Sequence, residues 1–401
     1  MLGDKGASVH VREFVSGAAA LGHEVVLVCA TLGSGNPAPP ARILLVQVPT
    51  EDKILNEACR DLGLDADFAT SVAARREFER LAYDRVLPER VWRSLAEMGF
   101  EPDVIYERHA LFSRAGAIIA AALGVPRILE VNAPLVDEQV RHRTLVFVDL
   151  ALEREAESYR KADSIIAVSE AVAAHIGSVI GSRRKVRVLS NGVDIARFDR
   201  SGRRKQFRAQ LGLGEEPVIG FIGSFKAWHG VEGLLDAFEL VLRRHSAAKL
   251  IAVGDGPELP ALRARAAAAP YASQVMFAGK VPHDEIPDWL AAMDLTAAPY
   301  LPQENFYFSP LKIVESLAAA RPVVAPCIGQ IAELVTHGQT GLLFAPGSVV
   351  GCAEAICALL DAPGRRIEMG AAGRCFAAGR DWTNVVRQVL SFAQPLAEQN
   401  P

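Results

Sequence analysis

The sequence predicts an α/β protein with two doubly wound domains, each built on a parallel sheet. Short apolar runs rich in β-branched residues alternate with longer helical segments along the 401 residues. Near-continuous apolar strands separated by helices are typical of parallel sheets covered on both faces. The runs form two successive sets, and a chain of this length is too long for one ordinary core. Two domains are therefore expected.

Each half of the chain carries its own set of predicted strands. In the first half they cover residues 24–30, 42–48, 103–107, 127–131, 164–168 and 186–190, and in the second half 217–223, 249–254, 275–279, 295–299, 322–325 and 342–344. The charged, glycine-containing segment 199–205 (DRSGRRK) lies between the sets and is typical of a linker. The predicted domains are residues 1–199 and 200–380, followed by a helical stretch within 381–401.

The beginning of the chain departs from this pattern. A doubly wound domain normally begins with a strand that leads into its first loop and helix. Here residues 3–8 have the composition of that loop, and a helix is predicted from Val9 with Ser8 as its N-cap. We therefore expect the first strand to be absent, through a misassigned start or the loss of about ten residues.

Composition disfavours several classes of function. The chain has 43 basic and 47 acidic residues and a net charge of −4, so nucleic acid is not the expected partner. No 18 consecutive residues are apolar, and residues 1–10 lack the pattern of a signal peptide. The six cysteines have no metal-ligand spacing and are expected to be buried in a reducing compartment. A cytoplasmic protein is the expectation.

Residues 52–98 are rich in arginine and carry no strand signal, so they predict an inserted helical layer. One interpretation is a solvated helix face on which Glu77, Glu79 and Glu89 balance the arginines. The alternative is a surface for an anionic lipid or a polyprenyl-phosphate acceptor, with peripheral contact at the inner membrane face.

The most informative stretch is residues 306–326, FYFSPLKIVESLAAARPVVAP. Ser309 is a good N-cap and Pro310 suits the first helical position, so a helix is predicted to begin just beyond the strand at 295–299. Free N–H groups and the helix dipole there favour a diphosphate. Lys312 and Glu315 share a face, and Glu315 is well placed to accept hydrogen bonds from ribose hydroxyls. The alternative is an ordinary surface helix.

This stretch closely resembles the nucleotide-sugar signature of the retaining GT-B glycosyltransferases of family 4. Further segments match that family in its order: residues 5–28, 128–135, 190–198, 217–238, 253–257 and 333–343. The resemblance covers nearly the whole chain. It implies two Rossmann-like domains that face a cleft, with the acceptor side in the first and the nucleotide sugar in the second. A final helix over 381–393 would pack back on the first domain.

The resemblance assigns the donor site. It implies that Glu315 holds the ribose and that the main chain of Ser309, Pro310 and Leu311 surrounds the diphosphate, although Pro310 has no N–H to donate. The family's second glutamate, near the donor sugar, is replaced by Tyr307. Glu304 lies three residues further upstream.

A second departure concerns the cations that face the diphosphate. The arginine and lysine common in the family are replaced by Ser224 and His229. Lys226 is expected to supply the missing charge with help from Lys312, and His229 is expected to contact phosphate, although such a histidine is more often structural. This charge stabilises the departing nucleoside diphosphate, because no motif for a catalytic metal is present.

Gly254 and Gly256 follow a strand, but Leu259 replaces the third glycine of a dinucleotide-binding fingerprint. A tight turn over the nucleotide base is the expected use of these two glycines. No nicotinamide or flavin cofactor is expected.

In the first domain the resemblance places the loop with Gly6 and Ala7 over the donor diphosphate and the acceptor. His109 follows the strand at 103–107 and matches the family's active-site histidine, which contacts the donor sugar. Asn132 and Glu138 are candidate acceptor contacts. The alternatives are an ordinary loop histidine and ordinary loop capping.

The implied activity is transfer of a sugar, with retention of configuration, from a UDP- or GDP-linked donor to a glycan, glycolipid or small-molecule acceptor. Neither metal nor other cofactor is expected. Three alternatives stay open: a non-catalytic nucleotide-binding relative that acts as a partner or scaffold, a sugar-nucleotide epimerase, and an oxidoreductase, which the failed glycine fingerprint disfavours.

Overall fold

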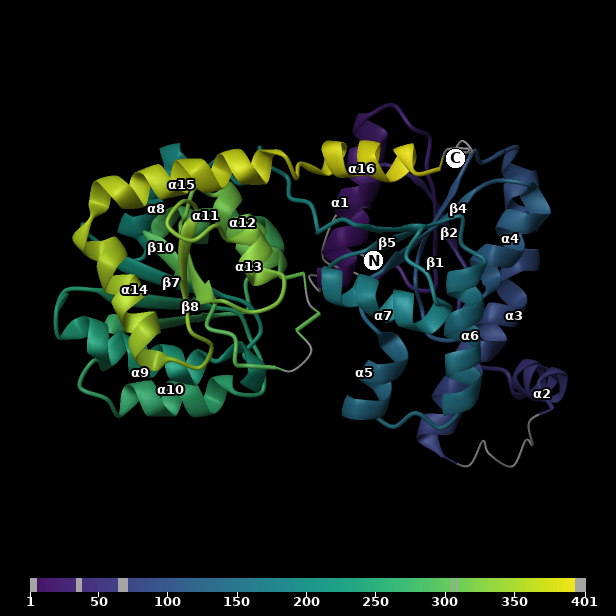
Figure 1. Cartoon of the computed structure of the whole chain (residues 1–401), viewed down its shortest axis with the longest axis horizontal. Helices are drawn as coiled ribbons and strands as arrows, with labels where there is room; N and C mark the ends of the chain where they lie inside the picture. Colours follow the sequence, from purple (N-terminus) through teal and green to yellow (C-terminus); the bar gives the residue numbers. More distant parts are fainter. Residues whose placement is uncertain (1–5, 34–37, 64–70, 304–305, 308, 394–401) are drawn as a thin grey trace. The chain divides into compact units, whose positions relative to one another are not determined.

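The computed structural model describes residues 6–33, 38–63, 71–303, 306–307 and 309–393 (Figure 1). The chain divides into two compact units, Met1–Ser190 with Thr383–Pro401, and Asn191–Trp382. Each unit is built on parallel strands, so the predicted α/β class is confirmed.

The strands of the first unit form two separate sheets. Four strands pair in sequence order, and two pair with each other alone. The larger sheet holds β3 (Ile105–Arg108), β4 (Arg127–Val131), β5 (Ser164–Ala167) and β6 (Val186–Val188), and the smaller holds β1 (Val26–Cys29) and β2 (Arg42–Leu45). No strand within the described residues joins them. All six segments predicted as strands are strands.

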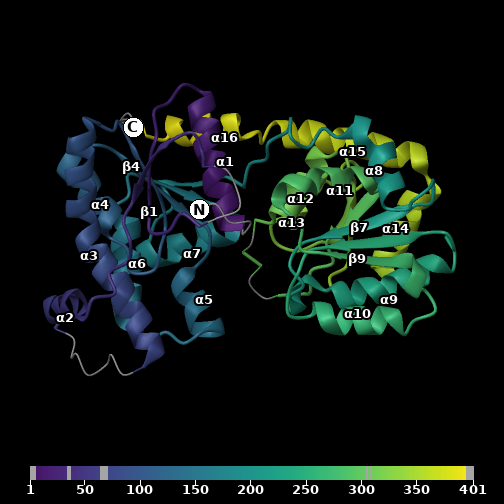
Figure 2. The same ribbon diagram turned by 180° about the vertical axis from the view of Figure 1, so that it is seen from behind.

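Helices surround these sheets (Figures 1 and 2). They are α1 (Gly6–Ala20), α2 (Asp52–Asp61), α3 (Val72–Met98), α4 (Ala115–Leu123), α5 (Leu135–His142), α6 (Val148–Arg160), α7 (Glu170–Ile180) and α16 (Trp382–Ser391). Ser8 lies within α1, which already includes Gly6, so the prediction that Ser8 is the N-cap is wrong. After α16, the Phe392 carbonyl accepts a hydrogen bond from the Ser164 hydroxyl at 2.8 Å, which ties this segment to β5.

The helical layer predicted over residues 52–98 is present as α2 and α3. Several of its arginines pair with carboxylates, among them Arg75 with Glu79 at 3.6 Å and Arg93 with Glu89 at 2.7 Å. Glu77 differs from the prediction of a solvated face, because it is 4% exposed. Its two carboxylate oxygens accept the N–H groups of residues 146 and 147 at 2.8 and 2.9 Å, which fixes the start of α6.

The second unit has one six-stranded parallel sheet in the order β12-β11-β10-β7-β8-β9. The strands are β7 (Val218–Ile222), β8 (Lys249–Val253), β9 (Val275–Gly279), β10 (Leu295–Ala297), β11 (Val323–Pro326) and β12 (Gly341–Phe344). The chain passes outward through β8 and β9 and then returns to the other side of β7 with β10. The strand order therefore reverses between β7 and β10, where open α/β sheets bind ligands at the carboxyl ends of their strands.

Both faces of this sheet are buried, which explains its uninterrupted apolar strands. Ile219 and Phe221 of β7 point into a core shared with α9 (Val231–Leu242), α10 (Leu259–Ala267) and α14 (Val349–Asp361). Val218 points into the opposite core, with α11 (Ile286–Ala292), α12 (Leu311–Ala318) and α13 (Ile331–Leu334). Figure 2 shows α9 and α10 side by side. The remaining helices are α8 (Arg204–Gln210) and α15 (Pro363–Ala378).

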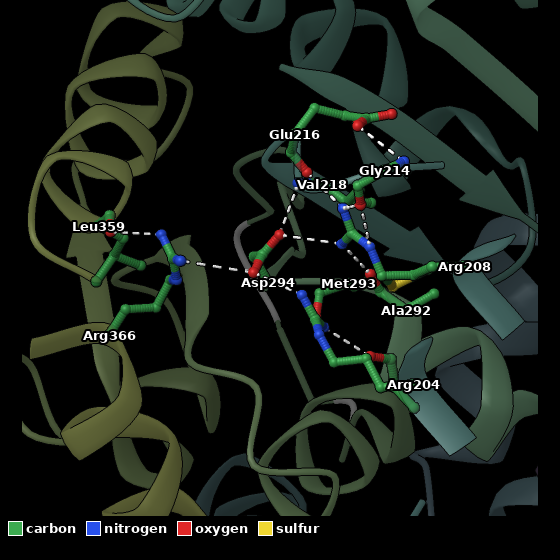
Figure 3. Close-up of polar contacts among 11 residues, drawn as sticks. Arg204, Arg208, Gly214, Glu216, Val218, Ala292, Met293, Asp294, Leu359 and Arg366 are labelled. Atoms are coloured by element: carbon green, nitrogen blue, oxygen red, sulfur yellow. Dashed lines mark hydrogen bonds and ion pairs between the residues drawn. The ribbon is translucent and has the colours of Figure 1, made fainter. Parts of the chain in front are cut away.

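The contact boundary lies at residues 190/191, nine residues before the predicted one. The charged segment predicted as a linker is bound to the second unit instead. Arg203 pairs with Asp288 at 3.1 Å. Figure 3 shows Arg204 and Arg208 reaching Asp294, at 2.8 and 3.5 Å, and donating to carbonyls at the end of α11. The charges of this segment therefore serve ion pairs.

Four of the six cysteines are buried as predicted, whereas Cys327 and Cys375 are exposed. None of the helices within the described ranges is long and apolar enough to cross a membrane.

Candidate functional site

Two loops meet where the strand order of the second unit reverses. One follows β7 and the other follows β10. The Leu301 N–H donates to the Trp228 carbonyl at 3.0 Å, and the rings of His229 and Tyr300 lie 5.1 Å apart, edge to face. Gly230 has φ +66°, and a Cβ there would lie 2.0 Å from the Pro299 carbonyl oxygen. Only glycine permits this close approach.

A third loop, after β8, packs backbone to backbone on the loop after β7. The N–H of Gly223 donates to Val253, and that of Phe225 donates to Asp255, both at 3.0 Å. A Cβ on Gly254 would lie 1.8 Å from the Gly223 carbonyl oxygen, and one on Gly256 would lie 2.5 Å from the Phe225 carbonyl oxygen. The two glycines are thus required by packing between loops, and contact with a base stays a prediction.

Helix α12 begins at this edge of the sheet, as predicted, but one residue later. Pro310 is the N-cap and Leu311 is the first helical residue. Ser309 is therefore not the cap: its hydroxyl accepts the Asn191 N–H at 3.3 Å, and its carbonyl accepts the Asn191 amide at 2.9 Å. The Ile313 N–H donates to the Pro310 carbonyl at 3.0 Å. The N–H groups of Leu311 and Lys312 have no acceptor one turn earlier in the helix, which suits an anion.

The Lys312 ammonium is buried beside these loops. Its Nζ has no hydrogen-bond partner among the described residues and lies 4.6 Å from the ring centroid of Phe221 and 4.9 Å from that of Tyr300. Burial lowers the pKa of Lys312 to about 7, opposed by the charge of Glu315. An unpaired buried cation costs free energy, and a bound anion would offset that cost.

His229 is neutral in this environment. Burial and then the nearby Lys312 lower its pKa to about 3. Its Nδ1 contacts the Ser224 carbonyl, which only accepts, so Nδ1 carries the proton and Nε2 is left with a lone pair. A hydrogen bond from His229 to phosphate would thus require a second proton on the ring. Lys226 is exposed and lies 4.6 Å from the Trp228 ring, so Lys312 is the buried cation here.

Glu315 is 8% exposed and lies on the same side of α12 as Lys312, three residues earlier. One carboxylate oxygen accepts a hydrogen bond from His283 Nε2 at 2.8 Å. The other ring nitrogen, Nδ1, contacts the Arg197 guanidinium. Tyr307 is half-buried, and Glu304 lies outside the described residues.

The predicted residues of the first unit lie on different elements. His109 follows β3 and its side chain is 3% exposed, with Nε2 3.8 Å from the Glu155 carboxylate. Glu155 also accepts from His175 Nε2 at 3.2 Å. Burial raises the pKa of Glu155, but the nearby His109 and the hydrogen bond from His175 outweigh it and lower the pKa to about 2. Burial lowers the pKa of His175, but the hydrogen bond to Glu155 and its charge outweigh burial, so the pKa of His175 is raised.

Asn132 is engaged by a buried carboxylate. Its amide donates to Glu130, which is fully buried on β4 and also accepts from His10 at 2.7 Å and from the Tyr106 hydroxyl. Glu138 lies half-buried in the first turn of α5. Two further predicted residues are exposed at the start of α1, Gly6 and Ala7.

The second unit thus gathers its predicted residues at one edge of its sheet, and sequence reasoning missed the pair behind Glu315. His283 follows β9, so its place at the carboxyl edge of a strand was a usable signal. Arg197 had no such signal, because it lies 86 positions from His283. Within the described residues no group of histidine, cysteine, aspartate and glutamate side chains is arranged to hold a metal ion.

The chain has two units built on parallel sheets, and the second has a helix start suited to an anion at the point where its strand order reverses. This is the architecture of the GT-B proteins. Residues 5–197 match the family model described as Glycosyltransferase Family 4, and residues 216–362 match that described as Glycosyl transferases group 1. The chain is 30% identical to D-inositol 3-phosphate glycosyltransferase 1 of Catenulispora acidiphila, over 80% of this chain and 79% of that protein. It belongs to glycosyltransferase family 4.

Two further similar proteins carry the name of a nucleotide in their descriptions. A GDP-mannose-dependent alpha-(1-6)-phosphatidylinositol monomannoside mannosyltransferase of Mycobacterium tuberculosis is 32% identical over 57% of this chain and 61% of its own length, so the match spans less than two thirds of that relative. The crystal structure of HepE from Anabaena in complex with UDP has a TM-score of 0.63 and 25% identity, over 76% of this chain and 81% of that one.

Proposed function

We propose that this protein is a retaining glycosyltransferase that moves a hexosyl group from a nucleoside-diphosphate sugar to an acceptor hydroxyl. The observation that carries the proposal is the buried ammonium of Lys312, which has no hydrogen-bond partner among the residues described and lies one turn before Glu315 at the start of α12. The names of the relatives support a nucleotide-sugar donor, since one is GDP-mannose-dependent and the HepE structure holds UDP.

In this proposal the second unit binds the donor. Lys312 and the first N–H groups of α12 face the diphosphate, and Glu315 accepts hydrogen bonds from the ribose hydroxyls. Lys226, at the exposed end of the loop, adds charge when the donor is bound. These groups stabilise the negative charge that develops as the nucleoside diphosphate departs, an effect worth about 3–4 kcal/mol per well-placed donor in comparable sites. No metal ion is required.

The bond changes balance without any further reactant. The bond from the anomeric carbon to the diphosphate oxygen breaks, and a bond from that carbon to the acceptor oxygen forms on the same face. The acceptor proton passes to the departing diphosphate. His109 contacts the donor sugar from the first unit, and Asn132 and Glu138 help to hold the acceptor, which is a glycan, a glycolipid or a small molecule.

The first experiment measures the melting temperature of the unaltered protein with UDP, GDP, ADP and dTDP. A ligand at 100 times its dissociation constant should add roughly 2.7 kcal/mol of stability. The shift should vanish in Glu315→Ala and persist in a matched control, Glu354→Ala, on the exposed side of α14. No shift with any of the four nucleotides would overturn the donor site.

The nucleotide that binds then selects the sugar donors for an acceptor screen. NMR of the product against the donor reports whether the anomeric configuration is retained. Two results would support the competing functions. Nucleotide binding without any turnover supports a non-catalytic relative, and nucleotide release with an altered sugar in the absence of acceptor supports an epimerase.

A further inference from the structure

Behind the proposed ribose carboxylate lies a second layer of polar side chains. Glu315 and His283 come from different parts of the second unit: Glu315 lies on α12, after β10, and His283 opens the short helical turn His283–Glu285 after β9. Their side chains are 11% and 12% exposed, and 2.8 Å separates His283 Nε2 from Glu315 Oε1. A mostly buried carboxylate is thus held by a donor from outside its own helix.

The Arg197 guanidinium determines which ring nitrogen of His283 carries the proton. It contacts Nδ1 of His283, and a guanidinium has no acceptor. Nδ1 must therefore accept, which leaves the ring proton on Nε2. That proton points at Glu315. The hydrogen bond made by one ring nitrogen of a histidine fixes the role of the other.

Arg197 is itself held in place from several directions. Its backbone N–H donates to the Asp194 carboxylate at 3.0 Å. Its guanidinium lies 3.9 Å from the Asp284 carboxylate and 5.6 Å from the centroid of the Phe198 ring. These contacts come from two segments of the chain, residues 194–198 and the turn that begins at His283. A guanidinium held in this way presents a fixed donor to Nδ1.

We propose that Arg197 and His283 are positioning residues that orient the Glu315 carboxylate for the ribose. The proposal rests on the proposed function, because it takes Glu315 as the ribose contact. His283 occupies Oε1 of Glu315, and no hydrogen bond to Oε2 is found within the described part of the chain. Oε2 is therefore the oxygen that meets the 2′- and 3′-hydroxyls. A carboxylate accepts and does not donate, so the arrangement selects a ribonucleotide over its 2′-deoxy form.

The test compares the dissociation constants of UDP and 2′-deoxy-UDP, and of GDP and 2′-deoxy-GDP, by calorimetry. In the unaltered protein the ribonucleotide should bind roughly tenfold tighter, as expected for one hydrogen bond to a charged group. In His283→Phe this preference should fall to about twofold, because the ribonucleotide weakens and the deoxynucleotide barely changes. His283→Gln, which keeps an N–H donor, should restore most of it, and Arg197→Met should resemble His283→Phe.

Controls separate positioning from folding and from the proposed function. His337→Phe, at an exposed histidine before β12, should leave the preference unchanged. Equal weakening of both nucleotides in His283→Phe would mark a merely structural role. If nucleotide binds and the preference is unaltered, positioning alone fails; if no nucleotide binds the unaltered protein, the proposed function fails with it.

A measurement without nucleotide tests the tautomer directly. In the ¹⁵N-labelled full-length protein, the ring nitrogens of His283 should show the Nε2–H form. The Nδ1–H form would overturn the proposal even if UDP binds tightly, because Nε2 would then have no proton to donate to Glu315.

Discussion

The Nζ of Lys312 lies 4.9 Å from the centroid of the Tyr300 ring, in a position where no described residue accepts a hydrogen bond from it. Phe221 covers the ammonium from another side at 4.6 Å. The aromatic rings stabilise the charge only in part, as the lowered pKa of Lys312 indicates. Binding and stability are therefore expected to respond in opposite ways to changes at this residue.

Nucleotide binding should weaken as pH rises above 7. The pKa of Lys312 in the free protein is about 7, so the residue is protonated below that pH and neutral above it. A diphosphate binds the protonated form, so the affinity for UDP or GDP should fall by up to about tenfold per pH unit above 7. Calorimetry at pH 7.5, 8.5 and 9.5 measures the slope. Lys312→Met should show no slope, and binding that tightens with pH would contradict the assignment.

Lys312→Met should stabilise the unliganded protein while it weakens nucleotide binding. At pH 6 the buried charge lowers the free energy of unfolding, and its removal should raise it by about 1 kcal/mol. The gain should shrink as pH rises from 7 toward 10.5, because the folded protein then releases this proton before the unfolded chain does. Urea unfolding at pH 6 and 9 measures it, with the exposed Lys205→Met as control. A loss of stability at pH 6 would contradict the prediction.

Gly230→Ala should destabilise the second unit by about 3 kcal/mol, because it adds left-handed backbone strain to a collision with the Pro299 carbonyl oxygen. Gly212→Ala is the matched control. Gly212 has φ +68° but nothing within 4 Å of its Cβ position, so only strain remains and about 1 kcal/mol is expected. Urea unfolding compares them. Equal costs would mean that the two loops separate easily.

Glu155→Gln should destabilise the first unit by about 3 kcal/mol near pH 6, because it breaks a buried charged pair. The pKa of His175 is raised in the folded protein, so its pairing with Glu155 stabilises the fold fully below the pKa of the unfolded chain. That stability is lost as pH rises through the pKa of the folded protein, so the cost of the substitution should be smaller at pH 8. The lowered pKa of Glu155 adds stability that is lost as pH falls from 4.5 toward 2. Unfolding at pH 3, 6 and 8 tests both signs, with the exposed Glu153→Gln as control. A cost independent of pH would contradict the coupling.

The strands could be predicted from sequence because each is a short run rich in apolar residues, and central ones such as β7 and β8 are almost fully buried. The clustering of Lys312 and Glu315 was predictable too, because helical periodicity alone places residues three apart on one side. Both inferences use neighbours within one element.

Features that depend on distant residues could not be predicted. The Ser309 hydroxyl is taken by Asn191, 118 positions away, so local capping preference failed there. The charged segment at 199–205 looked like a linker because its partners, Asp288 and Asp294, lie far along the chain. The contacts of Arg197 with His283 and of Glu130 with His10 are equally remote, since buried pairs leave no local periodicity.

The ion pair between Arg204 and Asp294 also sets the order in which the second unit can fold during synthesis. These residues are 90 positions apart, so α8 leaves the ribosome long before its partner exists. At translation rates of roughly 5–20 residues per second, the helix waits about 5–20 seconds with its arginines in water. Any nascent chain that ends before β10 therefore carries an undocked basic helix, and the second unit closes only after the strand that completes its centre has emerged.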